Sequence, residues 1–171
     1  MSQSLNALRA RARNLKLMAF DVDGVMTDGR LYFGPDGETF KVFHTLDGHG
    51  LKMLAAAGVT LAIITGRNSP MVARRARDLG IAHVIQGRED KGVALQALAE
   101  ELGLEAAVIG YAGDDLPDVP AMEWSALAFS VPNGHPRAQA CADMVTERRG
   151  GDGAVREICD FILGARPEIE A

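Results

Sequence analysis

The chain has 171 residues, of which 47% are apolar and only 5% aromatic, and its formal net charge is −5. This length suits about one domain, and the dominance of Ala, Val, Leu and Ile favours interleaved strands and helices over an aromatic-rich β-sandwich. Because the basic residues are dispersed and no apolar stretch approaches a membrane span, we expect neither a nucleic-acid nor a membrane partner, and a cytoplasmic location.

Neither the N-terminal segment nor the cysteines indicate a specialised role. The first 20 residues lack acids and carry Arg9, Arg11 and Arg13. No apolar stretch of the kind found in a targeting peptide follows, so we interpret this segment as a lead-in to the first strand. Cys141 and Cys159 match no metal-binding or redox spacing, and we interpret both as reduced core residues.

Short apolar runs alternate with amphipathic segments along the chain. The runs predict buried strands at Leu17–Phe20, Val59–Ile64, His83–Ile85, Ala107–Ile109, Leu127–Val131 and Met144–Thr146. The segments between them predict helices at about Gly50–Ala57, Pro70–Leu79, Lys91–Leu102, Pro136–Cys141 and Ala154–Leu163. This order predicts an α/β fold, a Rossmann-like doubly wound parallel sheet in a single domain over residues 1–171.

One segment departs from the alternation. Residues 30–33 and 38–43 flank the turn-forming tetrapeptide of residues 34–37, Gly-Pro-Asp-Gly, which predicts a β-hairpin flap at about 30–43, directly after the first strand. No inserted segment is long enough to form a cap domain. An isolated hairpin is marginally stable in water, so we expect this one to pack against something, either its own domain or a neighbouring subunit.

The first strand ends in the run LMAFDVDGVMTDG, with Asp21 and Asp23 two residues apart. Side chains at this spacing face the same way on an extended strand, so both carboxylates could converge on one point, and Gly24 permits a tight turn after them. Taken alone, such a pair is more often a turn or a general cation site.

The next two motifs also follow strands. In LAIITGRNSP, Thr65 and nearby amides could hold a phosphate, although Ser69 and Pro70 also fit an ordinary helix start. In QGREDKGVALQAL, Lys91 begins a helix, where the helix dipole makes a lysine slightly unfavourable. The alternative for Lys91 is a solvated surface lysine.

The fourth motif, VIGYAGDDLPDVPAM, places Asp114, Asp115 and Asp118 within five residues. A divalent cation would relieve their mutual repulsion through hard oxygen ligands, although an acidic helix cap is the simpler alternative. All four motifs lie at the carboxyl ends of predicted strands, which is where open α/β sheets bind ligands.

The succession DVDGV, ITGR, DK and GDDLPD resembles the four signature motifs of the haloacid dehalogenase superfamily, from about Leu17 to Val131. Within it, DVDGVMTDG, the hairpin, FHTLDGHGLKML and ITGR resemble the small capless phosphatases that act on 3-deoxy-D-manno-octulosonate 8-phosphate, an intermediate of lipopolysaccharide core synthesis. Close relatives of those enzymes act on sialic-acid-type 9-phosphates. Lys52 departs from the family, which usually has arginine there.

The resemblance implies a Mg²⁺-dependent phosphomonoesterase that works through an aspartyl phosphate. Asp21 would be the nucleophile and Asp23 the general acid and base. Asp21, the backbone carbonyl of Asp23 and Asp114 would hold Mg²⁺, while Thr65 and Lys91 would bind the transferring phosphoryl group. Asp115 and Asp118 would support the metal and Lys91.

The resemblance also implies a small phosphorylated sugar acid as substrate and a homotetramer in which hairpins of neighbouring subunits meet. Guanidinium groups bind carboxylate and phosphate in a bidentate manner, which suits Arg67 and Arg75 to such a substrate. The full set of implied substrate contacts is Asp23, His44, Thr45, Leu46, Asp47, Gly48, Lys52, Arg67, Arg75 and Lys91.

Two alternatives come from other functional classes. A receiver-type phospho-acceptor domain also uses Asp, a divalent cation, Thr and Lys on a doubly wound sheet. Receivers place the Lys after their acidic pair, whereas Lys91 here precedes Asp114 and Asp115. A non-catalytic binding protein that keeps the fold is the second alternative, and the presence of every motif residue argues against it.

Overall fold

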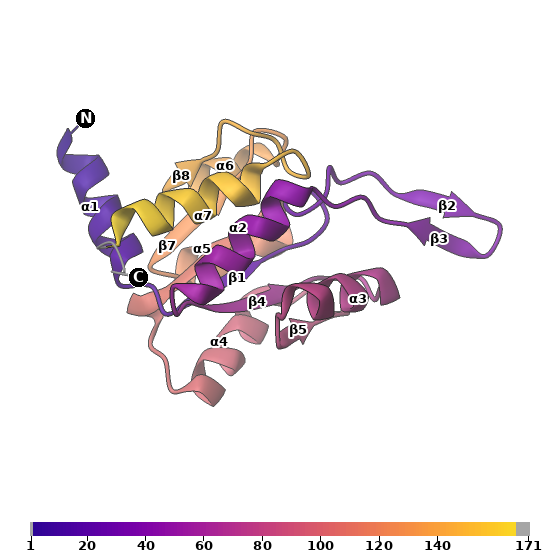
Figure 1. Ribbon diagram of the computed structural model, residues 1–171, viewed down its shortest axis with the longest axis horizontal. Coiled ribbons are helices and arrows are strands. Elements are labelled where there is room, and N and C mark those ends of the chain that lie inside the picture. The colour runs from indigo at the N-terminus through magenta and orange to yellow at the C-terminus, as the bar shows by residue number, and fades with distance from the viewer. Residues whose placement is uncertain (1, 167–171) are drawn as a thin grey trace.

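The computed structural model describes residues 2–166 and contains a six-stranded parallel sheet with helices on both faces (Figure 1). The strand order is β5-β4-β1-β6-β7-β8, and every pair in it is parallel. The strands are β1 (Leu17–Phe20), β4 (Thr60–Ile64), β5 (His83–Ile85), β6 (Ile109–Ala112), β7 (Leu127–Ser130) and β8 (Met144–Val145). The predicted doubly wound α/β fold is confirmed.

Two apolar cores lie on opposite faces of the sheet. Met18 and Phe20 of β1 pack into one core with α1 (Ser2–Arg13), α2 (Thr45–Ala56), α3 (Pro70–Leu79) and α7 (Ala154–Ala165). Leu17 and Ala19 pack into the other with α4 (Lys91–Leu102), α5 (Val119–Trp124) and α6 (Pro136–Cys141). The alternation follows from the two-residue period of a strand that is covered on both sides.

Three helix predictions needed correction. The N-terminal segment is the helix α1 rather than a lead-in, because Ala12 and Leu15 are fully buried and Arg13 Nε donates to the carbonyl of Ala165 at 2.9 Å. Helix α2 begins at Thr45 rather than Gly50, since the low helix propensity of Gly48 and Gly50 hides its first turns. Helix α5 was not predicted.

The strand predicted at Ala107–Ile109 lies later, at Ile109–Ala112, and residues 106–108 form a 3₁₀ turn. The later position pairs all four residues of β6 with the whole of β1, from Leu17 with Ile109 to Phe20 with Ala112. The glycine in the run Ile-Gly-Tyr-Ala interrupts the apolar pattern, so the sequence did not indicate this strand. Cys159 is buried as predicted, whereas Cys141 is only partly buried, and both are free thiols.

The predicted hairpin is present as β2 (Tyr32–Gly34) and β3 (Gly37–Phe40), and it projects from the body of the domain (Figure 1). Tyr32 stacks on Phe40 with ring centroids 4.5 Å apart. Phe33 is nonetheless 62% exposed and Phe40 50% exposed. Within residues 2–166, therefore, the domain does not cover the apolar side chains of its own hairpin.

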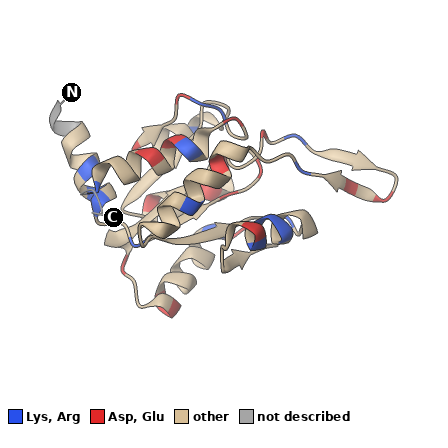
Figure 2. Ribbon diagram, viewed as in Figure 1, with Lys and Arg blue, Asp and Glu red and all other residues tan. Residues whose placement is uncertain are grey.

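Basic residues are distributed over several separate elements among the described residues. Figure 2 shows basic residues on α1, α3 and α7, which are separate helices. No helix within residues 2–166 combines the length and apolar character that crossing a bilayer requires.

The loop after β8 packs tightly on the turn that follows β1. Asn133 joins the two segments, because its Nδ2 donates to the carbonyl of Gly24 at 2.9 Å and its Oδ1 accepts from the amide of Gly150 at 2.7 Å. A Cβ on Gly150 would lie 1.7 Å from the carbonyl oxygen of Gly24. Only glycine allows this approach of two backbones.

We expect Gly150→Ala to lower the free energy of unfolding by about 1–3 kcal/mol, because two backbone segments must move apart to admit the methyl group. Gly164→Ala is the matched control, since Gly164 lies in α7 with no atom near its would-be Cβ. The control should raise stability by about 0.5–1 kcal/mol through helix propensity. Urea unfolding of both variants tests this, and equal effects would contradict the packing argument.

Candidate active site

The four sequence motifs meet at the carboxyl edge of the sheet, because the strands that carry them are parallel and adjacent. They surround a cavity of about 350 Å³. Its lining residues are Asp21, Asp23, Gly29, Leu31, Thr65, Gly66, Arg67, Glu89, Lys91, Asp114, Asp115 and Pro117. Every predicted catalytic and metal-binding residue is in this set, and so is Leu31 from the hairpin arm.

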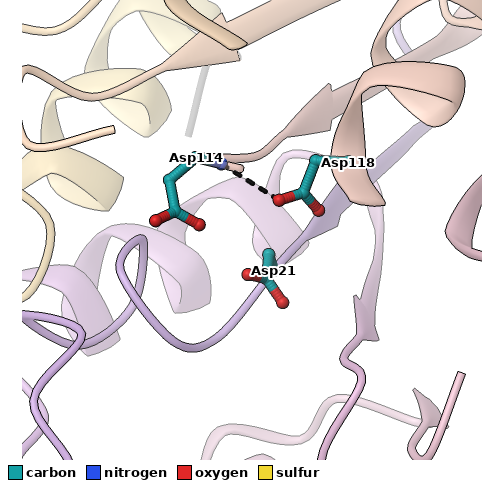
Figure 3. Close-up of side chains that lie close together, drawn as sticks. All are labelled: Asp21, Asp114 and Asp118. Atoms are coloured by element: carbon teal, nitrogen blue, oxygen red, sulfur yellow. Dashed lines mark hydrogen bonds between the residues drawn. The ribbon is translucent and has the colours of Figure 1, made fainter. Parts of the chain in front are cut away.

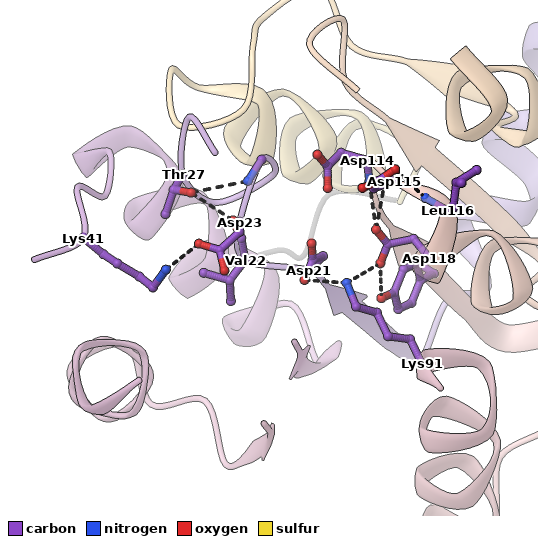
Figure 4. Close-up of polar contacts among 12 residues, drawn as sticks. Asp21, Val22, Asp23, Thr27, Lys41, Lys91, Asp114, Asp115, Leu116 and Asp118 are labelled. Carbon is purple, nitrogen blue, oxygen red and sulfur yellow. Dashed lines mark hydrogen bonds and ion pairs between the residues drawn. The ribbon is translucent and has the colours of Figure 1, made fainter. Parts of the chain in front are cut away.

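Lys91 forms a buried ion-pair network at the base of the cavity (Figure 4). Its Nζ lies 2.8 Å from Asp21 Oδ1 and 2.8 Å from Asp118 Oδ1. Burial opposes the charge of Lys91, but the two carboxylates outweigh it, so the pKa of Lys91 is raised. The alternative of a solvated surface lysine is wrong, since Lys91 is only 5% exposed.

Asp118 is fully buried and organises the motif around it. Besides the Lys91 ammonium, its carboxylate accepts from the hydroxyl of Tyr111 at 2.8 Å and from the amides of Asp114 and Asp115, each at 3.1 Å. The Asp115 side chain instead caps the next turn by accepting from the amide of Leu116. Sequence reasoning missed Tyr111, which looks like an ordinary apolar position in a buried strand.

Asp21, Asp114 and Asp118 each place a carboxylate oxygen within 4.8 Å of the others (Figure 3). Burial, and then the charge of Asp118, raise the pKa of Asp21 well above its ordinary value. The same two causes raise the pKa of Asp114 to about 7. Ionised carboxylates this close and this buried need a counter-charge.

A divalent cation fits this cluster. Asp118 already uses its oxygens for Lys91, Tyr111 and two amides, which leaves the carboxylates of Asp21 and Asp114 available to hold an ion. Carboxylate oxygens are the donors that Mg²⁺ prefers. The residues present therefore suit a magnesium ion between the ends of β1 and β6.

Asp23 lies beside Asp21 and is held from the opposite side by Lys41 (Figure 4). The Lys41 side chain is only 1% exposed and forms ion pairs with Asp23 Oδ1 and, at 2.8 Å, with Glu38 Oε1. Lys41 was not predicted as a site residue. The only feature of the sequence that could have indicated Lys41 is its position directly after the second arm of the predicted hairpin, where the chain returns to the domain.

Thr65 directly follows β4 and is 2% exposed, and its backbone is hydrogen-bonded to those of Ile85 and Arg88. Arg67 lies two residues beyond it, and its guanidinium is 5.9 Å from the ring centroid of Phe33 on the hairpin. Ser69 stands at the N-cap of α3 as predicted, but its side chain makes no capping hydrogen bond.

The structure does not bring the remaining predicted substrate contacts into this cavity. His44 caps α2, with its Nδ1 accepting from the amide of Leu46 at 3.2 Å. The Asp47 carboxylate accepts from the amide of Arg156 at 2.8 Å, and burial raises its pKa. Outside the cavity lining lie His44, Thr45, Leu46, Asp47, Gly48, Lys52 and Arg75.

Arg75 belongs to a second cavity, of about 370 Å³, at the base of the hairpin. Its guanidinium lies 5.7 Å from the ring centroid of Phe43 and donates to the carbonyl of His44 at 3.4 Å. Lys52 is exposed on α2. These residues do not line the cavity around Asp21, and their predicted role in substrate binding stays a prediction.

A family model and individual relatives place the chain in the same protein family. A family model of haloacid dehalogenase-like hydrolases matches residues 80–158. The chain is 42% identical over 161 residues to the 3-deoxy-D-manno-octulosonate 8-phosphate phosphatase KdsC of Escherichia coli (strain K12), covering 94% of this chain and 86% of that protein. It is 44% identical over 160 residues to the protein of the same name from Yersinia pestis, with the same coverage.

Solved structures agree with these relatives. The 3-deoxy-D-manno-octulosonate 8-phosphate phosphatase of Moraxella catarrhalis, solved with magnesium ion, phosphate ion and KDO, superposes with a TM-score of 0.92 at 46% identity and covers 94% of this chain and 92% of its own. The cobalt-bound phosphatase YrbI of Haemophilus influenzae superposes with a TM-score of 0.89 at 39% identity, covering 91% of each chain.

The raised pKa of Asp114 predicts how Mg²⁺ affects stability. Its folded pKa, about 7, exceeds the ordinary 3.8, so in metal-free protein this group's stabilising contribution is present below about pH 4 and lost as the pH rises through 7. Mg²⁺ binds the ionised form and competes with the proton. We expect the Mg²⁺-induced rise in Tm, relative to EDTA, to be larger at about pH 8 than at about pH 5.

Thermal unfolding with and without Mg²⁺ at both pH values measures this difference. Asp114→Asn is the matched control, because it removes the titrating ligand without changing the size of the side chain. It should weaken the Mg²⁺-induced rise at both pH values and reduce its pH dependence, while Asp21, whose pKa is also raised, still contributes. A rise that is equal at both pH values in the wild type would contradict the assignment of Asp114 as a ligand.

Proposed function

The chain belongs to the haloacid dehalogenase-like hydrolases, in the family of 3-deoxy-D-manno-octulosonate 8-phosphate phosphatases, and we propose that it hydrolyses this phosphomonoester in lipopolysaccharide core synthesis with Mg²⁺ as cofactor. The observation that carries the proposal is the convergence of Asp21, Asp23, Thr65, Lys91 and Asp114 on one cavity. Two relatives this similar over nearly the whole chain are both named as phosphatases of this substrate.

Charge repulsion is the first obstacle to the reaction. A phosphate dianion about 4 Å from an ionised carboxylate, at an effective dielectric near 20, meets on the order of 8 kcal/mol of repulsion. Mg²⁺, when held by Asp21, Asp114 and the backbone carbonyl of Asp23, supplies the positive charge that offsets this repulsion. Lys91 adds a second, permanent positive charge beside Asp21, fixed by Asp118.

The chemistry proceeds in two steps on Asp21. A carboxylate oxygen of Asp21 attacks phosphorus, the bond from phosphorus to the sugar oxygen breaks, and Asp23 gives its proton to that oxygen. Asp23 then takes a proton from a water molecule, whose oxygen attacks the phosphorus of the aspartyl phosphate. Inorganic phosphate leaves and the Asp21 carboxylate is restored. Thr65 and Lys91 donate hydrogen bonds to the phosphoryl oxygens throughout.

Arginine side chains and residues of a neighbouring subunit would bind the sugar acid. Arg67 lines the cavity and can bind a carboxylate in a bidentate manner. Arg75 and residues 44–48 lie outside their own subunit's cavity. We propose that they reach substrate across a subunit interface.

We expect kcat/KM for 3-deoxy-D-manno-octulosonate 8-phosphate to exceed that for a sialic-acid-type 9-phosphate or simple sugar phosphates. Asp21→Asn should remove turnover, because the nucleophile is lost, and only Asp21 should take up phosphoryl label in the wild type. A panel of phosphates assayed with Mg²⁺, followed by peptide mapping of the labelled protein, makes the test. Preference for the 9-phosphate would favour the alternative substrate, and stoichiometric labelling without turnover would favour a signalling domain.

We also propose that the chain forms a homotetramer through its hairpin. Leu31, Phe33, Phe40 and Val42 are 41–62% exposed on a ribbon that its own domain leaves uncovered within residues 2–166. Burial of this apolar surface between subunits would stabilise the assembly, and closed symmetry would protect the ribbon's edges. The cytoplasmic location expected from the sequence stays a prediction.

We expect Phe33→Asp to dissociate the assembly and to lower kcat/KM for the sugar phosphate by at least about tenfold, since a buried charge costs more than an interface of this kind can supply. Turnover of p-nitrophenyl phosphate should fall less. Leu5→Asp is the control, because Leu5 is 42% exposed on α1, far from the cavity in the fold. Light scattering that shows a fully active wild-type monomer would contradict the proposal.

A further inference from the structure

Lys41 is a buried lysine that the reaction as described above does not use. It follows β3 directly, where the hairpin returns toward α2. Its side chain is 1% exposed and lies between the carboxylates of Asp23 and Glu38. A lysine is rarely buried unless its charge is paired, so this position demands a specific partner.

The Asp23 carboxylate depends on Lys41 for its orientation. Thr27 organises the backbone of the same turn, accepting at its Oγ1 from the amides of Gly24 and Gly29 at 3.3 and 3.2 Å. Those hydrogen bonds do not involve the Asp23 side chain. Across residues 2–166, the Lys41 ammonium is the single hydrogen-bond or ion-pair partner of this carboxylate.

The contact also distinguishes the two oxygens of Asp23. An ammonium group has donors and no acceptor, so it occupies lone pairs of the one oxygen that it binds and leaves the other oxygen of the carboxylate free. Lys41 binds Oδ1. Oδ2 is therefore the oxygen of Asp23 that faces the reacting groups without a partner among the described residues.

We propose that Lys41 is a positioning residue for the reaction, and this rests on the proposed function. It holds Oδ1 of Asp23 so that Oδ2 delivers the proton to the leaving sugar oxygen and later takes the proton from water. Lys41 itself neither gains nor loses a proton. Figure 4 shows the resulting arrangement, with Lys41 on the Asp23 side and Lys91 on the Asp21 side of the aspartate pair.

Glu38 connects the contact between Lys41 and Asp23 to the hairpin. It forms an ion pair with Lys41 at 2.8 Å and lies opposite Phe33 in the β2–β3 register. The position of the ammonium is therefore set by the folded hairpin. A subunit whose hairpin is displaced loses the alignment of Asp23 while keeping Asp21, Lys91 and the cation ligands in place.

The test compares Lys41→Met with Lys41→Arg on two substrates. A sugar alkoxide needs a proton to leave and p-nitrophenolate does not. We expect Lys41→Met to lower kcat on 3-deoxy-D-manno-octulosonate 8-phosphate by about 10–100-fold with little change in KM. On p-nitrophenyl phosphate it should keep a rapid stoichiometric burst but turn over slowly, because aspartyl phosphate accumulates. Lys41→Arg should restore most of the activity.

Lys16→Met is the matched control, because Lys16 is exposed at the amino end of β1 and should leave both activities unchanged. Light scattering and thermal unfolding establish that assembly and fold are kept. If Lys41→Met does not fold, the double variant Lys41→Met with Glu38→Gln removes both charges and takes its place.

Equal losses on both substrates without a burst, or an unchanged kcat on the sugar phosphate, would overturn the role of Lys41. A wild type that hydrolyses neither substrate would instead overturn the proposed function. These two outcomes can be told apart, because the effect of Lys41→Met is measured only if the wild-type protein is active and becomes labelled on Asp21.

Discussion

The buried contact between Lys91 and the carboxylates of Asp21 and Asp118 is the interaction on which the site depends. It joins the end of β1 and the turn that follows β6 to the first turn of α4, and all of these elements pack on the same apolar core. One ammonium cannot neutralise Asp21, Asp114 and Asp118 together. The remaining negative charge is what makes the edge of the sheet suitable for a divalent cation and, with that cation, for a phosphate dianion.

Asp118 shows why this arrangement is rigid. It is fully buried, yet it has four donors, from Lys91, Tyr111 and the amides of Asp114 and Asp115. A buried carboxylate with all its lone pairs satisfied holds its neighbours in one geometry. It therefore orients Lys91 toward Asp21 and turns the chain so that Asp114 faces the cavity, while Asp118 itself does not line that cavity.

The hairpin brings side chains to the edge of the cavity in a fold that has no cap domain. Leu31 lines the cavity, Phe33 lies beside Arg67, and Lys41 reaches Asp23 from the returning arm. A ribbon that projects from the domain is poorly determined by that domain alone. In the proposed tetramer, contacts between subunits would therefore act on Asp23, the proposed acid and base, through the hairpin, whereas Asp21 and Asp114 directly follow strands of the sheet.

Local sequence patterns predicted the parts of the protein that depend on neighbours in the chain. The motifs with Asp21, Thr65, Lys91 and Asp114 are short and follow strands, and parallel strands bring their carboxyl ends to one edge, so the sequence alone predicts their convergence. The hairpin was visible in its turn residues for the same reason.

Only the tertiary structure decided the contacts between segments distant in sequence. Helix α1 exists because α7 and the sheet cover its apolar face, and β6 is set by pairing with β1 rather than by its own apolar run. Lys41 meets Asp23 across 18 residues and Tyr111 supports a motif from inside a strand. Such contacts leave no periodic trace in a single sequence, since they depend on where the whole chain places each side chain.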